Sequence, residues 1–220
     1  MIYDIEIVKA LIEEKYNKKL HIVVGDKKFI PFVSYTTRAI RPGETDGVEH
    51  KFLNVDEADK LLEEKKDDIL AYTEINGAKY FTTKDQMKDY NVYIIDPNGI
   101  KNLKENHPEI KLNIYYIGSS FNNRYRRYVQ RLGVEATAMG MFKFKKRDDS
   151  EGQQFTEFEN SSEDFHSFIN DNPYLNGTIY NIFCKVIDNY DPNAIICFVG
   201  RTASGKDTIV RHLVELFNYK

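Results

Sequence analysis

The sequence lacks the features that mark secreted and membrane proteins. Its 220 residues include only two cysteines, Cys184 and Cys197, which lie in separate apolar runs. Two distant cysteines suit buried free thiols better than a disulfide framework, and they favour a reducing compartment. No apolar run approaches the length that spans a membrane, and the N-terminus has no basic-then-apolar signal layout. These absences predict a cytoplasmic protein without membrane contacts.

A large excess of charge of either sign is also absent. The 31 lysines and arginines nearly balance 34 acidic residues, so the formal net charge is only -3. This balance argues against a general affinity for nucleic acid and leaves room only for a local basic patch. The sequence has no internal repeat and no low-complexity tract. With 41% hydrophobic residues, it predicts one globular domain, or one domain with a mobile sub-part.

The most informative stretch lies near the C-terminus, over residues 194–217. An apolar run over 194–199 predicts a buried strand, and apolar residues at helical spacing predict a helix after residue 206. Between them, two glycines four residues apart and a following lysine match the spacing of a phosphate-binding loop. Backbone N–H groups of such a loop surround phosphates, and the lysine reaches the β- and γ-phosphates. The competing interpretation is a glycine turn that happens to precede a helix. The predicted ATP-binding residues are Gly200, Arg201, Thr202, Ala203, Ser204, Gly205, Lys206, Asp207 and Thr208.

One position of this loop departs from the usual pattern. Asp207 stands where a serine or threonine normally contacts magnesium, and Thr208 follows it. A carboxylate beside a triphosphate is repulsive unless Mg²⁺ lies between them, directly or through water. The sequence therefore predicts ATP and Mg²⁺ as cofactors, with Asp207 and Thr208 as metal ligands.

The rest of the chain alternates short apolar strands with helices, which predicts an α/β fold with a parallel sheet flanked by helices. Segment 20–35 reads as a hairpin or as two strands that pair elsewhere, and 133–160 reads as polar and irregular. Asn54 and Glu57 have capping-box spacing at the start of one helix. Helices are expected over 5–16, 55–66, 119–132 and about 161–170, and strands over 69–75, 91–96, 111–118 and 178–187.

A second motif, residues 34–52, combines hydroxyl groups with arginines. Arg38 and Arg41 lie three residues apart, close behind Ser34 and two threonines. Guanidinium groups offer fixed pairs of donors that suit a phosphate dianion, although a solvated charged loop would also contain such arginines. The segment resembles the GMP-binding signature of guanylate kinases, S-x-T-T-R-x-x-R-x-G-E-x-x-G-x-x-Y-x-F, at nearly every defining position.

The resemblance to guanylate kinases, which are P-loop nucleoside monophosphate kinases, implies ligands for the acceptor nucleotide. Ser34, Arg38 and Arg41 match the family's phosphate ligands, and His50 replaces a tyrosine that assists them. The segment NGAKYFTT resembles the family's G-N-x-Y-G-T/S turn, which implies further contacts with the phosphate and the base. YIIDPNG resembles its D-I-D-x-Q-G strand end, which implies a carboxylate at the acceptor. The residues so implied are Tyr80 for the phosphate, Thr82 for the base, and Asp96 for the carboxylate.

The segment SSFNNRYRRYVQRLG resembles the helix that enters the family's lid. The resemblance places Arg127 and Arg131 on charge-stabilising arginines and makes Arg147 a candidate for the later lid arginine. Such groups suit phosphoryl transfer, which is catalysed by positioning and by neutralising charge on the transferring group. With Lys206 they form the predicted catalytic set, although a single basic helix face explains the arginines of 124–131 equally well.

Base recognition departs from the family pattern. The family's guanine-reading glutamate falls on Ala71, and the first carboxylate of D-I-D falls on Ile94. Glu74 is the only acid near Ala71, and it is included among the acceptor ligands although a strand would direct it to the opposite face. A carboxylate that accepts from two guanine N–H groups rejects adenine, so its loss predicts weaker discrimination between bases.

The order of the two motifs also departs from the family, in which the phosphate-binding loop opens the chain. Here the loop closes it, which predicts a circularly permuted domain over 1–220, with residues 1–27 as an addition or a relocated helix. Because permutation requires neighbouring termini, Lys220 is expected near the strand that contains Phe32. A gene boundary that joined two pieces is the alternative. Within the domain we expect an acceptor subdomain over 34–84, a lid over about 124–160, and the loop unit over 194–217.

The sequence thus predicts transfer of the γ-phosphoryl group of Mg-ATP to GMP, dGMP or a related monophosphate. Small-molecule nucleotides are the expected partners, with no nucleic acid and no membrane, and the expected assembly is a monomer or a homodimer. A non-catalytic binding module with a guanylate-kinase-like fold is one alternative. A kinase of a sugar phosphate such as ribose bisphosphate is the other, because the G-K-D-T/S loop ending resembles phage deoxynucleotide kinases and ribose-bisphosphate kinases.

Overall fold

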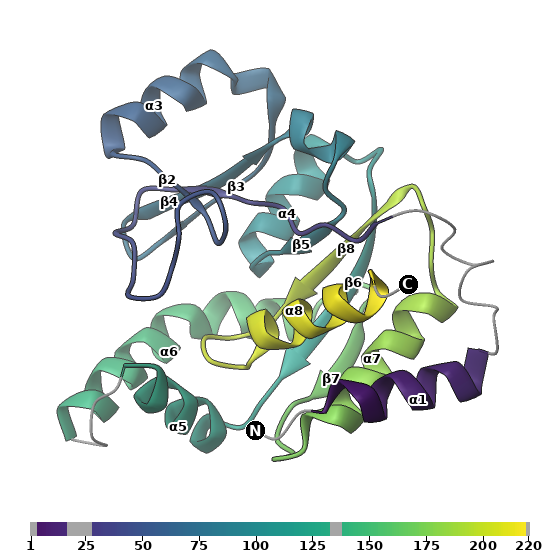
Figure 1. The fold of residues 1–220 in the computed structure, drawn as a ribbon. Coiled ribbons are helices and arrows are strands. Elements are labelled where there is room, and N and C mark those ends of the chain that lie inside the picture. The colour runs from purple at the N-terminus through teal and green to yellow at the C-terminus, as the bar shows by residue number, and fades with distance from the viewer. Residues whose placement is uncertain (1–3, 17–27, 133–137, 219–220) are drawn as a thin grey trace.

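The computed structural model describes residues 4–16, 28–132 and 138–218 and contains two sheets (Figure 1). The main sheet is parallel throughout, with the strand order β5-β8-β6-β7. Its strands are β5 (Val92–Ile94), β8 (Ala194–Val199), β6 (Lys111–Gly118) and β7 (His166–Ile169). The predicted α/β fold with a parallel sheet flanked by helices is confirmed.

Alternation along the central strand β8 divides the core into two layers. All six residues of β8 are buried, and those at even positions face one layer while those at odd positions face the other. The even face packs against α1 (Ile5–Tyr16), α7 (Leu175–Asp188) and α8 (Lys206–Phe217). The odd face packs against α4 (Pro97–Asn106) and α6 (Ala138–Glu159). Cys184 and Cys197 are buried free thiols, one in each layer.

The second sheet lies above the main sheet in Figure 1 and has the order β2-β1-β4-β3. Its strands are β2 (Lys51–Phe52), β1 (Tyr35–Thr36), β4 (Ala78–Thr83) and β3 (Ile69–Ile75). Only β1 and β2 pair in parallel, and the other pairs are antiparallel. The connecting helices are α3 (Val55–Glu64), η1 (Lys66–Asp68) and η2 (Lys84–Lys88). Asn54 and Glu57 form the predicted capping box at the start of α3.

A helix pair, α5 (Phe121–Leu132) and α6, extends away from the main sheet below the second sheet in Figure 1. The two helices pack through Phe144 of α6, whose fully buried ring contacts three aromatic rings of α5. The prediction that 133–160 is irregular was therefore wrong for 138–159. Its polar composition hid a helix whose buried residues, including Phe144, Phe155 and Phe158, are too few to give a strong periodic signal.

The expected helix near 161–170 and strand over 178–187 were also wrong. The structure has the strand β7 in the first segment and the helix α7 in the second. The apolar run of α7 is dense enough to resemble a buried strand, but its buried residues follow helical spacing from Leu175 through Ile179 to Ile182 and Val186. Other expected elements are confirmed with small changes of boundary. Residues 20–24, which belong to the expected hairpin, lie outside the described residues, and 28–34 contributes only a bridge between Pro31 and Val92.

The end of α8 lies beside the start of the segment that leads into β1. Asn218 accepts a hydrogen bond from the backbone N–H of Phe29 at 3.0 Å and donates one to its carbonyl at 2.9 Å. The ring of Phe29 stacks on Phe217, with ring centroids 4.1 Å apart. Lys220, which the sequence placed near this strand, lies outside the described residues. Within the described ranges, no helix combines the length and the apolar character needed to cross a membrane.

Candidate active site

One cavity gathers residues from the three predicted site segments. It lies between the second sheet, the carboxyl ends of β5 and β8, and α6. This is where ligands bind in open α/β sheets, because successive strands direct loops and helix N-termini to the same edge. Of the predicted residues, its lining includes Ser34, Arg38, Arg41, His50, Tyr80, Asp96, Arg131, Arg147, Gly200, Thr202, Ala203, Lys206 and Asp207.

The phosphate-binding loop has the backbone that its glycines allow. A Cβ on Gly200 would lie 2.5 Å from the carbonyl oxygen of Ile117, so only glycine fits between β6 and the loop. Gly205 has a φ of +90°, which disfavours any side chain, and the helix α8 begins at the next residue. The N-terminus of α8 therefore faces the cavity together with Lys206.

Arg127 lies behind this loop and does not line the cavity. Its guanidinium group donates to the carbonyl oxygen of Ser204 at 2.9 Å, to Ser119 Oγ at 3.0 Å and to the carbonyl oxygen of Asn170. Asn170 also donates to the carbonyl oxygen of Ser204, at 2.8 Å. The structure thus corrects the expectation that Arg127 faces the transferring group: it supports the loop from below. The arginines of α5 point in more than one direction around the helix, so the sequence did not show which of them faces the cavity.

Arg38 and Arg41 are held by an acid that the sequence did not assign to the site. Glu44 accepts two hydrogen bonds from the guanidinium group of Arg38, at 2.6 and 2.7 Å, and one from the backbone N–H of Arg41 at 2.9 Å. Burial lowers the pKa of Arg38, but the hydrogen bonds and charge of Glu44 more than offset this effect and raise it. Glu44 is the glutamate of the signature over 34–52, and its presence there was the signal for this role.

Several positive charges lie close together in the cavity. Burial lowers the pKa of Arg41, and the nearby charges of Arg38, Arg131 and Arg147 lower it further. Burial and the charge of Arg147 act in the same direction on the pKa of Arg131. Cations that lower one another's pKa are brought together at a cost, and an anion between them would remove that cost. The cavity is therefore suited to a group with several negative charges.

His50 lies beside the phosphate ligands, where its charged form is disfavoured. Its ring meets that of Tyr80 edge-on, with centroids 5.8 Å apart. Burial lowers the pKa of His50, and the positive charge of Arg38 lowers it further. The imidazole can still donate one hydrogen bond to an anion.

Two predicted base ligands do not line the cavity. The hydroxyl group of Thr82 is fully buried and lies 2.7 Å from the hydroxyl group of Tyr93, which itself lines the cavity. Glu74 lies in a neighbouring depression with Asn98 and Glu157, as expected for its side of β3. Thr82 and Glu74 are therefore not brought to the base site directly.

Two residues beyond Ala71 on β3, Thr73 brings a polar side chain to the same face of the strand. Ala71 and Thr73 both line the cavity, and Thr73 donates from its hydroxyl group to Asp96 Oδ2 at 3.0 Å. Asp96 caps α4 through the backbone N–H of Gly99 at 2.9 Å. Burial raises the pKa of Asp96, although these hydrogen bonds oppose the shift. The period of two along β3 was the signal that could have identified Thr73.

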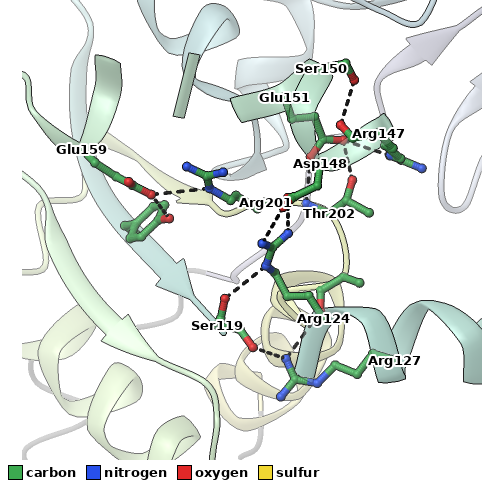
Figure 2. Close-up of polar contacts among 12 residues, drawn as sticks. Ser119, Arg124, Arg127, Arg147, Asp148, Ser150, Glu151, Glu159, Arg201 and Thr202 are labelled. Carbon is green, nitrogen blue, oxygen red and sulfur yellow. Dashed lines mark hydrogen bonds and ion pairs between the residues drawn. The ribbon is translucent and has the colours of Figure 1, made fainter. Parts of the chain in front are cut away.

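The helix α6 contacts the loop through Glu151, which the sequence did not identify (Figure 2). Its carboxylate accepts from the backbone N–H of Thr202 at 2.9 Å, from the Thr202 hydroxyl group, and from Arg147 Nε at 3.0 Å. Arg201 is turned away toward Glu159, at 3.6 Å, and does not line the cavity. Once 147–151 is known to be helical, the four-residue spacing of Arg147 and Glu151 indicates this contact.

The donors near the start of α8 fit magnesium bound together with phosphates. Asp207 lines the cavity with an exposed carboxylate 3.9 Å from Lys206 Nζ. Desolvation opposes the charged form, but the positive charge of Lys206 prevails and lowers the pKa of Asp207. Thr208, the other predicted ligand, is not part of the lining, nor are Ser204 and Gly205. The described part of the chain contains no group of three His, Cys, Asp or Glu residues that could hold a metal alone. Mg²⁺ commonly uses one or two carboxylates and substrate phosphates, which suits this donor set.

Comparisons with known proteins agree with these features. The family model for guanylate kinase matches residues 14–179, well over half of the chain. The chain belongs to the guanylate kinase family. It is 31% identical over 119 residues to the guanylate kinase of Pasteurella multocida, a match that covers 51% of this chain and 55% of the relative. It is 32% identical over 106 residues to that of Haemophilus influenzae, covering 45% and 50%. The chain thus spans about half the length of the curated relatives it matches.

A solved guanylate kinase shares the fold. The crystal structure of guanylate kinase from Anaplasma phagocytophilum aligns with a TM-score of 0.50 at 17% identity and covers 79% of each chain. The match to the guanylate kinase family model ends at residue 179, before the phosphate-binding loop at 200–206. The loop of this family member thus lies outside the part of the sequence that the family model matches.

Proposed function

We propose that the chain is an ATP-dependent nucleoside monophosphate kinase. One observation carries the proposal: a single cavity is lined both by the loop residue Lys206 and by the phosphate motif of Ser34, Arg38 and Arg41. Arg131 and Arg147 line the same cavity. Two anion sites joined by arginines are what transfer of a phosphoryl group between two phosphates requires.

In the proposed reaction, an oxygen of the acceptor phosphate attacks the γ-phosphorus of ATP. The bond from that phosphorus to the β–γ bridging oxygen breaks, so ADP leaves and the acceptor becomes a diphosphate. Loop N–H groups and Lys206 hold the β- and γ-phosphates, while Arg38, Arg41 and Tyr80 hold the acceptor. Arg131 and Arg147 neutralise charge on the transferring oxygens. Magnesium bound at Asp207 would offset charge on the β- and γ-phosphates when present.

The acceptor is proposed to be GMP, dGMP or a related monophosphate. Ala71 places no carboxylate at the position where the family's glutamate reads guanine. The carboxylate of Asp96 already accepts hydrogen bonds from the Thr73 hydroxyl group and the Gly99 N–H. We therefore expect weak discrimination between bases. The test is coupled-enzyme turnover of Mg-ATP with a panel of nucleoside monophosphates. Turnover of at least one acceptor, and loss of most of the rate in Lys206→Ala with its circular dichroism spectrum unchanged, would support the proposal. Absence of both turnover and ATP binding would refute it.

Two other functions make predictions that further experiments distinguish. A non-catalytic binding module is favoured by Ala71, Ile94 and His50, but the intact loop argues against it. Calorimetry separates the two, because a module should not bind Mg-ATP. A sugar-phosphate kinase keeps the ATP half of the site, and a competition assay between GMP and ribose bisphosphate distinguishes it.

The chain order is proposed to be a circular permutation with an acceptor subdomain over 34–84 and a lid over 124–160. The contact between Asn218 and Phe29 supports it, because the end of the loop helix lies where the family's chain would continue into the acceptor strand. The position of the loop beyond the matched residues also supports it. A chain re-permuted to begin at 194 and joined from 220 to 1, which keeps the core helix α1, should fold and bind ATP. We further propose a cytoplasmic monomer or homodimer, which fractionation and light scattering would test.

A further inference from the structure

In the contact between α6 and the phosphate-binding loop, Glu151 joins a loop residue, Thr202, to Arg147. Glu151 is only 6% exposed, and both of its carboxylate oxygens are used. One accepts from the backbone N–H of Thr202, and the other accepts from the Thr202 hydroxyl group and from Arg147 Nε. A buried carboxylate that bridges a loop amide and a guanidinium group fixes both, because removing either partner leaves a costly buried charge.

The arrangement directs the free end of Arg147 toward the cavity. Arg147 uses Nε for Glu151, and the residue lines the cavity together with Lys206 and Arg131. Its positive charge reaches Arg41 and Arg131, since it contributes to the lowered pKa of each. The two terminal nitrogens of a guanidinium group held through Nε remain available for a phosphate.

We infer that Glu151 is a positioning residue that aligns Arg147 on the γ-phosphate by tying it to the loop amide of Thr202. The inference rests on the proposed kinase function and goes beyond it, because it assigns a role to a residue outside the recognised motifs. The loop then holds both the donor phosphates and, through Glu151, the arginine that neutralises them. The buried ion pair of Arg124 and Asp148 separately joins α6 to α5 (Figure 2). The position of α6 therefore does not depend on Glu151 alone.

Kinetics of Glu151 and Arg147 variants provide the first test. Arg147→Ala should lower kcat by about a thousandfold, the low end for arginines that stabilise charge in phosphoryl transfer. Glu151→Ala should lower kcat by about tenfold or more with KM for ATP changed far less, as for residues that orient a metal ligand. In the Arg147→Ala background, Glu151→Ala should add less than about a twofold loss, since both changes remove one interaction. Asp149→Ala, an exposed acid on the same helix, is the matched control and should leave kcat unchanged.

Hydrogen exchange gives a readout that does not depend on turnover. The Thr202 amide should exchange faster in Glu151→Ala and stay protected in Glu151→Gln, whose amide oxygen can still accept it. Glu151→Gln should nevertheless lose rate, because its remaining NH₂ group cannot accept from Arg147. An additive loss in the double variant, or a gain in kcat and ATP affinity in Glu151→Ala, would overturn the inference in favour of a carboxylate that merely blocks the loop.

The two proposals fail in distinguishable ways. A wild-type protein without turnover would refute the kinase, and the inference would then be tested by affinity for a non-hydrolysable ATP analogue. The same non-additive pattern between Glu151→Ala and Arg147→Ala is expected there, and independent effects would overturn it. A wild-type protein with turnover and a Glu151→Ala variant with normal kcat would leave the kinase standing and refute the role of Glu151.

Discussion

The ion pair of Arg124 and Asp148 joins α5 to α6, and its loss should be costly. Arg124 is 4% exposed, and its guanidinium group donates to both carboxylate oxygens of Asp148 and, through Nε, to the carbonyl oxygen of Ser119 at 3.1 Å. Asp148→Ala leaves a buried cation without its partner, which costs about 3–5 kcal/mol. At about 2–4 °C per kcal/mol for a domain of this size, Tm should fall by roughly 6–20 °C.

Urea unfolding followed by circular dichroism, together with a thermal scan, measures this loss. Asp149→Ala is the control, because Asp149 is the exposed neighbour and its removal should change the free energy of unfolding by less than about 0.5 kcal/mol. The double variant Arg124→Met, Asp148→Leu removes both charges and should recover most of the stability. A loss of less than about 1 kcal/mol in Asp148→Ala would show that the pair behaves as a surface ion pair and would refute the reasoning.

Three further perturbations follow from the site. Gly200→Ala should abolish binding of an ATP analogue in a thermal-shift assay, because the new Cβ would meet the Ile117 carbonyl oxygen at 2.5 Å; Gly177→Ala, which meets nothing within 4 Å, should bind as wild type. Ala71→Glu should raise the preference of kcat/KM for GMP over AMP by about tenfold or more, at about 1.5–3 kcal/mol per charged hydrogen bond, and an unchanged ratio would contradict the assignment of the base site. Desolvation opposes the charged form of Glu151, but its hydrogen bonds with Thr202 and the charge of Arg147 prevail and lower its pKa. Its contribution to stability is therefore present above the pKa of an unfolded glutamate and is lost as the pH falls through the lowered pKa. Glu151→Gln should lose less Tm than wild type between about pH 5 and pH 3.

Local signals predicted the elements whose chemistry is contained in their own residues. The loop required glycine at 200 and 205, and the structure gives each a steric reason. The capping box of Asn54 and the strands β3, β6 and β8 follow from turn residues and short apolar runs. In α6 and α7, by contrast, the number of apolar residues led to the wrong secondary structure, because burial there depends on partners far along the chain. Phe144 is buried by aromatic rings of α5, which no pattern within 138–159 reveals.

The same distinction explains which site residues the sequence identified. Residues within the S-x-T-T-R motif reach the cavity because short loops fix their direction, and Glu44 was recoverable from its place in that motif. On a helix, the direction of a side chain depends on how the helix is turned, so Arg127 and Arg131 of α5 separate, with one beneath the loop and one at the cavity. Thr82 was misplaced for a related reason: Tyr93, on a different sheet, takes its hydroxyl group.

The acids of the site explain how so many cations stay together before an anion arrives. Each of two arginines in the cavity has its own carboxylate, Glu44 for Arg38 and Glu151 for Arg147. Arg41 lies 3.9 Å from a Glu44 oxygen, and the charges of Asp207 and Glu44 only partly offset the lowered pKa of Arg131. The paired arginines are fixed in direction before substrate binds, which lowers the cost of ordering them. Arg41 and Arg131 retain the repulsion that a bound phosphate relieves, so their contribution to affinity should weaken with salt more steeply than that of Arg38.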